Sequence, residues 1–245
     1  MVHLWGVSIW GLLLAALAMA AGTLIQGAIG FGTNLVAAPI LAVINPDFVP
    51  VPVIFASFVF NVLVARRDRG ELPWQAIRWP LVGLVPASVI GAAAVAVIDK
   101  RGLGILFSVL VLIGVALSVS GLHPRPSRPA LTVAGAASGF MGTTTGIGGP
   151  PMALMFQKHR GPQIRASLAR FFGVGSVMSI IPLLAFGQVE LADLGRALVL
   201  IPGGLVGFAL SKHLAKRLDH GYVRHAVLAV SALSAVIVLV RSLTS

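Results

Sequence analysis

The sequence predicts an all-α protein that crosses a lipid bilayer several times. Of the 245 residues, 57% are hydrophobic and only 10% are charged, whereas a soluble domain has about a quarter charged residues. The chain also divides into eight apolar segments, and most of them have the ~20 residues that a spanning helix requires. The segments are 6–44, 49–65, 74–98, 102–121, 129–156, 163–187, 191–211 and 222–240.

The net charge of +11 resembles that of a nucleic-acid-binding domain. In a chain this apolar, however, Lys and Arg are expected to gather in the short loops of a membrane protein. We therefore expect contacts with membrane lipid and no nucleic-acid partner. The chain contains no Cys, which excludes a disulfide scaffold and a thiolate metal site. We predict neither a metal site nor a cofactor.

The two halves of the chain repeat each other. Two glycines and a proline recur 112 residues later, and a following Arg–Pro–Gly series recurs at offsets of 116 to 118. This pattern predicts two homologous four-segment repeats, 1–121 and 130–245, joined by the loop 122–129 into one integral membrane domain. The matched positions are Gly27, Gly30, Pro39, Arg78, Pro86 and Gly91 with Gly139, Gly142, Pro151, Arg196, Pro202 and Gly207.

The distribution of charge predicts how the first segment of each repeat is shaped. If both first segments span fully, the 18 Lys and Arg divide about 8 to 10 between the two sides. If both break at their glycines and turn back, 14 lie on one side and only Lys100, Arg101, Arg196 and Arg241 on the other. The positive-inside tendency favours the second arrangement, although a kinked spanning helix stays open. The repeats are then inverted, as in many transporters, and both termini lie outside.

The glycine-rich part of each repeat is the predicted substrate site. Glycine allows a helix to break at membrane depth where it lines a cavity. The new helix N-terminus then favours an anion, and nearby hydroxyl and amide groups add uncharged donors. For any single glycine, close helix packing is the alternative. The predicted substrate-binding residues are Gln26, Gly27, Gly30, Phe31, Gly32, Thr33, Asn34, Ser138, Gly139, Gly142, Thr143, Thr144, Thr145, Gly146 and Gly148, with Pro39, Gly149, Pro150 and Pro151 expected to end or break the helices.

Two arginines follow the second glycine segment. Arg170 shares a helix face with Gln163 and Ser167 and lies about two turns into its segment, where it either snorkels to the surface or faces a hydrated anion path. We include it in the predicted site, because a guanidinium can bind an oxyanion through a forked pair of hydrogen bonds. Arg165 is expected to snorkel. All the carboxylates lie in loops or at segment ends, so no proton relay is predicted.

These motifs resemble a known family. Gly27-x-x-Gly30-Phe31-Gly32, and Gly139-x-x-Gly142 with its following glycines and Pro150, are similar to the paired motifs of the TauE/SafE family of sulfite and organosulfonate transporters. The resemblance covers essentially the whole chain, although the segments 6–19 and 129–138 differ in length. It implies secondary transport of small sulfur-containing anions across the cytoplasmic membrane of a prokaryote, with a small anion as substrate.

Other functions are distinguishable from the sequence. No HExxH, GxSxG or intramembrane acid pair is present, so no enzymatic activity is expected. A permease for another small anion stays open. A cation or metal permease would need carboxylates within the membrane. A non-transporting assembly subunit would explain the small residues but not the repeated polar breaks. The oligomeric state is open, with a homodimer among the options.

Overall fold

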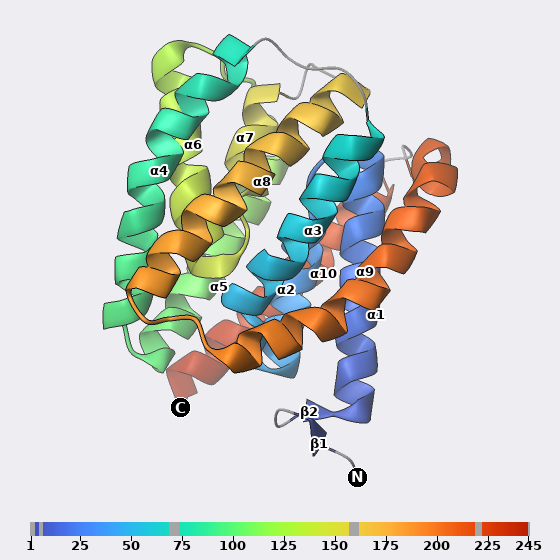
Figure 1. The fold of residues 1–245 in the computed structure, drawn as a ribbon, viewed down its shortest axis with the longest axis vertical. Coiled ribbons are helices and arrows are strands. Elements are labelled where there is room, and N and C mark those ends of the chain that lie inside the picture. The colour runs from blue at the N-terminus through green and yellow to red at the C-terminus, as the bar shows by residue number, and fades with distance from the viewer. Residues whose placement is uncertain (1–2, 5–6, 69–73, 157–161, 219–221, 245) are drawn as a thin grey trace.

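The computed structural model describes residues 3–4, 7–68, 74–156, 162–218 and 222–244, and nearly all of this part of the chain is helical (Figure 1). Two short strands, β1 (His3–Leu4) and β2 (Val7–Ser8), form an antiparallel pair before the first helix. The helical elements are α1 (Ile9–Ile29), α2 (Thr33–Ile44), the 3-10 turn η1 (Pro46–Phe48), α3 (Val51–Arg67), α4 (Trp74–Val97), α5 (Lys100–Val119), α6 (Arg128–Thr145), α7 (Gly149–Phe156), α8 (Pro162–Ala185), α9 (Leu191–Leu218) and α10 (Tyr222–Thr244).

Six stretches within the described residues are long and apolar enough to cross a membrane. Their outward faces carry large apolar side chains, such as Trp10 at 68% and Leu198 at 66% exposure, which a lipid environment accommodates. The chain is therefore a multi-pass membrane protein, as its composition predicts. The spanning stretches are Ile9–Ala28, Pro46–Arg67, Ile77–Val97, Lys100–Val119, Pro162–Ala185 and Leu191–Lys212.

Each glycine-rich segment forms two helices joined by a break, as the glycines predict. The segment 6–44 forms α1 and α2, and the segment 129–156 forms α6 and α7. Helix α2 runs back along α1, because Gly22 lies against the backbone of Thr33 while Gly11 lies near Ile44. Helix α7 packs against α6 in the same way around its own break. The breaks are thus sharp turns between neighbouring helices.

Glycines bring two helix pairs into close backbone contact. Helix α6 packs along α4, where a Cβ at Gly135 would lie 1.9 Å from the carbonyl oxygen of Pro80. Helix α9 packs along α1, where a Cβ at Gly203 would lie 2.1 Å from the carbonyl oxygen of Ala16. These approaches leave no room for a side chain, so the glycines here serve helix packing in the membrane.

Helices α3 and α8 pack against each other in the middle of the molecule, with α4 against α8 and α9 against α3 (Figure 1). The start of α1 and the end of α10 lie at the same end of the structure (Figure 1). Among the described residues, the buried carboxylates are Asp68 and Asp193. Asp68 caps the end of α3 and Asp193 lies in the first turn of α9, so both lie near helix ends, as expected.

Candidate functional site

The two helix breaks meet inside the molecule. Helix α1 ends at Gly30 (φ +100°), and Gly32 (φ +109°) precedes α2. Helix α6 ends at Gly146 (φ +77°). These left-handed conformations strain any residue with a Cβ. The Nδ2 group of Asn34 donates a hydrogen bond of 2.7 Å to the carbonyl of Gly146, so a side chain of the first break holds the backbone of the second.

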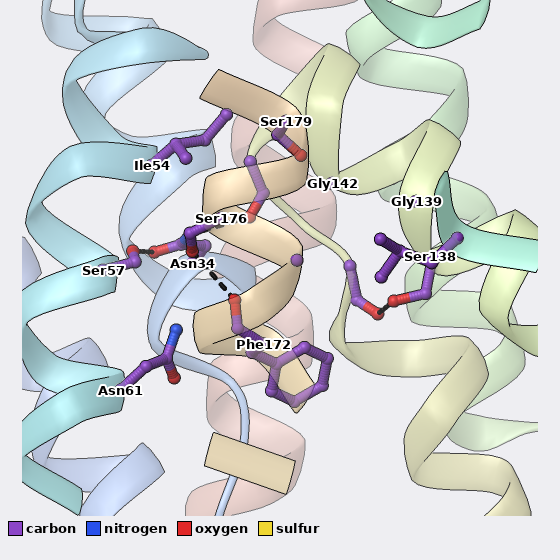
Figure 2. Close-up of a pocket in the computed structure, with 14 residues that line it drawn as sticks. Asn34, Ile54, Ser57, Asn61, Ser138, Gly139, Gly142, Phe172, Ser176 and Ser179 are labelled. Atoms are coloured by element: carbon purple, nitrogen blue, oxygen red, sulfur yellow. Dashed lines mark hydrogen bonds between the residues drawn. The ribbon is translucent and has the colours of Figure 1, made fainter. Parts of the chain in front are cut away.

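A small cavity of about 60 Å³ lies where the breaks meet α3 and α8 (Figure 2). One water needs at least about 10–15 Å³ on this scale, so the cavity has room for about four to six waters. Its described lining combines serine and asparagine side chains with glycines and apolar side chains, and it carries no charged side chain. The lining residues are Asn34, Ile54, Ser57, Asn61, Leu84, Ser138, Gly139, Gly142, Gly146, Gly148, Phe172, Gly175, Ser176 and Ser179.

A chain of buried side chains positions the amide of Asn61. The hydroxyl of Thr33 donates to Oε1 of Gln26, and Nε2 of Gln26 donates to Oδ1 of Asn61 over 2.7 Å. Successive hydrogen bonds of this kind polarise one another in a low-dielectric interior. The Nδ2 group of Asn61 is left as a donor, and Figure 2 shows it turned toward the cavity.

The other polar groups of the lining mostly hold the backbone. Ser57 donates to Oδ1 of Asn34 and to the Val53 carbonyl, both at 2.6 Å. Ser138 donates to the carbonyl of Gly148 at 2.6 Å. Ser176 bonds the carbonyl of Phe172 on its own helix, at 2.9 Å. These bonds make the walls rigid, which is a requirement for selective recognition of a small ligand.

The structure places the predicted site residues in three groups. Six line the cavity: Asn34, Ser138, Gly139, Gly142, Gly146 and Gly148. Three lie behind the lining: Gln26 bonds Asn61, Thr33 bonds Gln26, and Thr143 bonds Ser179 at 2.7 Å. Gly27, Gly30, Phe31, Gly32, Thr144, Thr145 and Arg170 lie outside the lining.

The residues outside the lining have other contacts. The Gly27 carbonyl accepts a hydrogen bond from Arg67, and Gly30 lies against Arg165. Phe31 packs against Gly149. Thr144 and Thr145 bond carbonyls of their own helix.

The predicted role of the prolines is corrected by the structure. Pro39 lies inside α2 rather than at its end. A proline there leaves the carbonyl four residues earlier without its usual partner, and the hydroxyl of Ser231 in α10 donates to that carbonyl, of Leu35, over 2.6 Å. Pro150 and Pro151 do not stop a helix but occupy the first turn of α7, which begins at Gly149. Their missing N–H groups need no partner in a first turn.

The site predicted from the sequence did not include the part of the lining that α3 and α8 contribute, namely Ile54, Ser57, Asn61, Phe172, Gly175, Ser176 and Ser179. Asn61 gave the clearest signal, because a polar residue within an apolar span often marks a functional site. Ser57 precedes it by four residues and so shares its helix face. Single serines in membrane helices are too common to have identified the rest.

An ion-pair cluster lies at the end of α3. Asp68 bonds Nε of Arg165 at 2.6 Å and Nε of Arg67 at 3.3 Å. Arg165 is therefore paired with a carboxylate 97 residues away, instead of snorkelling as expected. Burial alone would raise the pKa of Asp68, but the hydrogen bonds and charges of the two arginines lower that pKa below its ordinary value.

A second cluster lies at the opposite end of α3. The guanidinium of Arg196 bonds Asp47 at 2.9 Å and Asp193 at 3.0 Å. This cluster has one arginine and two carboxylates, whereas the cluster around Asp68 has two arginines and one carboxylate. The two ends of the molecule thus carry ion-pair clusters of opposite net charge within the described residues.

The spanning helices define a multi-pass membrane protein, and the two helix breaks leave a small cavity between them. The chain matches the family described as "Sulfite exporter TauE/SafE" over residues 14–238. It belongs to this family, which comprises transporters and not enzymes, and the resemblance of the glycine motifs is confirmed.

One curated relative is described as "Probable sulfite/organosulfonate exporter TauE" of Cupriavidus necator. It is 24% identical over 209 residues, and the match covers 78% of this chain and 79% of the relative. No solved structure matches the chain.

Proposed function

We propose that this protein is a secondary transporter that exports small sulfur-containing anions, such as sulfite or organosulfonates, and that the cavity is its substrate site. The observation that carries the proposal is an uncharged, polar cavity at the meeting point of two helix breaks. Sulfite, with one sulfur and three oxygens, is small enough for a cavity of about 60 Å³. The substrate class is supported by the family and by the description of the relative.

Anion binding here would rest on neutral donors. The Nδ2 group of Asn61 faces the cavity (Figure 2), and the first turn of α2 presents backbone N–H groups beside Asn34 with the positive end of its helix dipole. Burying a charged side chain in the membrane would cost several kcal/mol. Neutral donors avoid this cost, and they also hold an anion weakly enough to release it on the other side.

The second break offers fewer donors than the first. Of the first four residues of α7, Pro150 and Pro151 have no N–H group, which leaves Gly149 and Met152. The glycines Gly142, Gly146 and Gly148 instead keep this wall of the cavity free of side chains. We infer that the second break gives the anion space, while the first break and α3 supply the donors.

We also propose that the two halves are inverted repeats with re-entrant glycine segments. In support, each of the helices α1 to α5 can be matched with the helix five later, α6 to α10. Under this match the packed pair α1–α9 becomes the packed pair α6–α4. The pairs α3–α8 and α5–α10 are unchanged by the same exchange. Inverted repeats with broken helices that meet at mid-membrane are a frequent transporter architecture.

The distribution of Lys and Arg supports an orientation with both termini outside the cytoplasmic membrane of a prokaryote. The end of α3 and the starts of α4, α6 and α8 lie together, at the end of the molecule opposite the start of α1 (Figure 1). Arg66, Arg78, Arg128 and Lys212 lie near these helix ends or the end of α9. Arg69, Lys158 and Arg160 lie outside the described residues.

The membrane potential supports outward transport. An anion in a negative cell is driven outward by about 2.3 kcal/mol per charge for every 100 mV. A uniporter would therefore export the anion without a proton relay. Among the residues that the structure describes, no carboxylate or imidazole lines the cavity, which also disfavours a cation permease.

Efflux from proteoliposomes tests the proposal. Vesicles loaded with sulfite, isethionate, sulfate, acetate or chloride are diluted into anion-free buffer under an inside-negative potential. Efflux that is fast for sulfite and slow for acetate and chloride is the expected result. Equal rates for all anions would assign a general anion permease, and no efflux above that of empty vesicles would favour a non-transporting subunit. Thermal unfolding gives a second readout, since a ligand at 100 times its Kd stabilises by about 2.7 kcal/mol.

A further inference from the structure

Arg67 and Arg165 share a carboxylate but differ in how their nitrogens are used. Arg67 donates from Nη1 to Ser211 and from Nη2 to the carbonyl of Gly27, both at 2.7 Å. Its guanidinium also lies over the ring of Phe208, 4.8 Å from the centroid. Arg67 therefore ties α1, α3 and α9 together, and its guanidinium is fully engaged.

Arg165 is engaged at one nitrogen. Its Nε donates to Asp68 at 2.6 Å, and within the described part of the chain neither Nη group makes a hydrogen bond. The side chain is 20% exposed, so solvent reaches it. The forked face of this guanidinium, which suits an oxyanion, is therefore open to a ligand from outside the protein.

The cluster lies on the route from the cavity to this end of the molecule. From Asn61 to Arg67, α3 rises about 9 Å, and from Arg165 to Phe172, α8 rises about 10.5 Å. Both Asn61 and Phe172 line the cavity, and α3 and α8 pack against each other. The bond from Arg165 to Asp68 thus joins α8 to α3 about two turns beyond the cavity.

The two ends of the molecule differ in what they offer an anion. Within the described residues, the cluster of Asp68, Arg67 and Arg165 sums to +1. The cluster of Arg196, Asp47 and Asp193 at the opposite end sums to −1. Clefts with one sign of charge concentrate ligands of the opposite sign, so the first cluster attracts anions more strongly than the second.

We propose that Arg165 is a second anion-binding site, at the mouth of the transport path, and that Asp68 is a built-in competitor for it. A small oxyanion that binds the open Nη groups of Arg165 lies beside the carboxylate of Asp68 at Nε and repels it, which weakens the ion pair between α3 and α8 and opens the cavity to this end of the molecule. This inference rests on the proposed function for the identity of the anion. Arg165, rather than Arg170, then receives the substrate first.

Two substitutions that break the same ion pair test the proposal, because they are expected to change KM for sulfite in opposite directions. Asp68→Asn removes the competitor and keeps Arg165, so KM for sulfite entering from the Arg165 side falls severalfold. Arg165→Gln removes the binding group, so the same KM rises about tenfold, as the loss of a charge-assisted hydrogen bond implies. A purely structural ion pair would move KM in the same direction in both variants, and that result overturns the proposal.

The flux measurements use phosphatidylcholine vesicles, so that no anionic headgroup competes for Arg165. Vesicles containing an anionic lipid form the second arm. If the KM of the two variants differs from that of wild type only in the vesicles that contain anionic lipid, Arg165 binds a lipid headgroup and not the transported anion.

Cysteine labelling tests the opening step independently of flux. The chain has no Cys, so Ser176→Cys places one thiol in the cavity wall. Combined with Asp68→Asn or Arg165→Gln, this thiol is expected to react about tenfold faster with a small anionic methanethiosulfonate added from the Arg165 side. Asp47→Asn, which removes a carboxylate from the opposite cluster, is the matched control and leaves the rate unchanged.

The outcomes separate the two proposals. If wild type carries no sulfur anion but Asp68→Asn still accelerates labelling, the proposed function fails and the closure by Asp68 stands. If wild type exports sulfite while Asp68→Asn changes neither KM nor labelling, the proposed function stands and this inference fails. Equal acceleration by Asp47→Asn also overturns it.

Discussion

The two helix breaks contain similar glycines but are stabilised in different ways. In the first break, both Gly30 and Gly32 are left-handed, and the side chains of Gln26 and Thr33 support the turn from within. In the second break, Gly146 alone of its glycines is left-handed. Its carbonyl is held by Asn34, a residue of the first break.

This difference assigns separate tasks to the two breaks. The first break is built from polar side chains whose bonds lead to the donor of Asn61. The second is held by Ser138 and Thr145, which bond its backbone, and it leaves room beside Gly142, where a Cβ would meet Gly148 at no less than 3.7 Å. One break therefore supplies recognition and the other supplies volume, and substitutions can separate the two.

Filling the second break is expected to give the largest effect. Gly142→Ala adds a methyl group to the cavity at ordinary van der Waals distance, so the protein folds with a stability within about 1 kcal/mol of wild type. Sulfite efflux falls about 10- to 100-fold, because the added methyl group takes up part of a cavity of only about 60 Å³. A flux assay measures the efflux, and thermal unfolding measures the stability.

Gly173→Ala is the matched control for this substitution. It also adds one methyl at ordinary distance, here 3.8 Å from Cβ of Asn61, on a buried face of α8 that does not line the cavity. Its efflux stays near the wild-type rate. Full activity of Gly142→Ala would contradict the assignment of volume to the second break.

The next largest effect is expected from removing the Asn61 amide, at the end of the hydrogen-bond chain from Thr33 through Gln26. Asn61→Ala takes away the amide that Figure 2 shows facing the cavity, so KM for sulfite rises about tenfold, the loss expected for a hydrogen bond to a charged ligand. Ser176→Ala is its control, since that hydroxyl bonds the backbone of its own helix and KM stays within about twofold. An unchanged KM in Asn61→Ala would assign recognition elsewhere.

Backbone strain distinguishes the breaks on a smaller scale. Gly32→Ala introduces a Cβ at φ +109° whose nearest neighbour is Ile25 at 3.5 Å, so it is strained but not crowded. It is expected to destabilise the protein by about 1–2 kcal/mol. Gly142→Ala, without a left-handed φ, has no such penalty. The comparison is made by thermal unfolding in detergent, and equal stability of the two variants would remove the distinction.

The smallest expected effect is that of pH on the cluster beside the first break. The pKa of Asp68 is lowered in the folded protein, so its ion pairs contribute stability above the ordinary carboxylate pKa of about 3.9. That contribution is lost as pH falls below about 4. The difference in Tm between wild type and Asp68→Asn is therefore constant from pH 8 to 5 and shrinks below pH 4. A difference that shrinks near pH 6 instead would exclude Asp68 as its source.

The sequence predicted those features that depend on local composition. Length and hydropathy located the spans, and the glycines located both breaks, because only glycine adopts the left-handed turns at Gly30, Gly32 and Gly146 without strain. It could not place Pro39 within α2, since the hydroxyl that replaces the lost hydrogen-bond partner lies 196 residues later. The partner of Arg165 was hidden for the same reason, and so was the α3–α8 wall of the cavity.

The bond from Ser231 to the carbonyl of Leu35 has a consequence for biosynthesis. A membrane segment is synthesised from its N-terminus, so α2 leaves the ribosome long before the residue that satisfies its interrupted helix. Until α10 arrives, the Leu35 carbonyl lacks the protein partner that the finished structure provides, and an unpaired carbonyl in lipid is costly. Helix α2 is thus completed by a residue made 196 positions later, and a ribosome-bound nascent chain ending before residue 231 would hold this region unfinished.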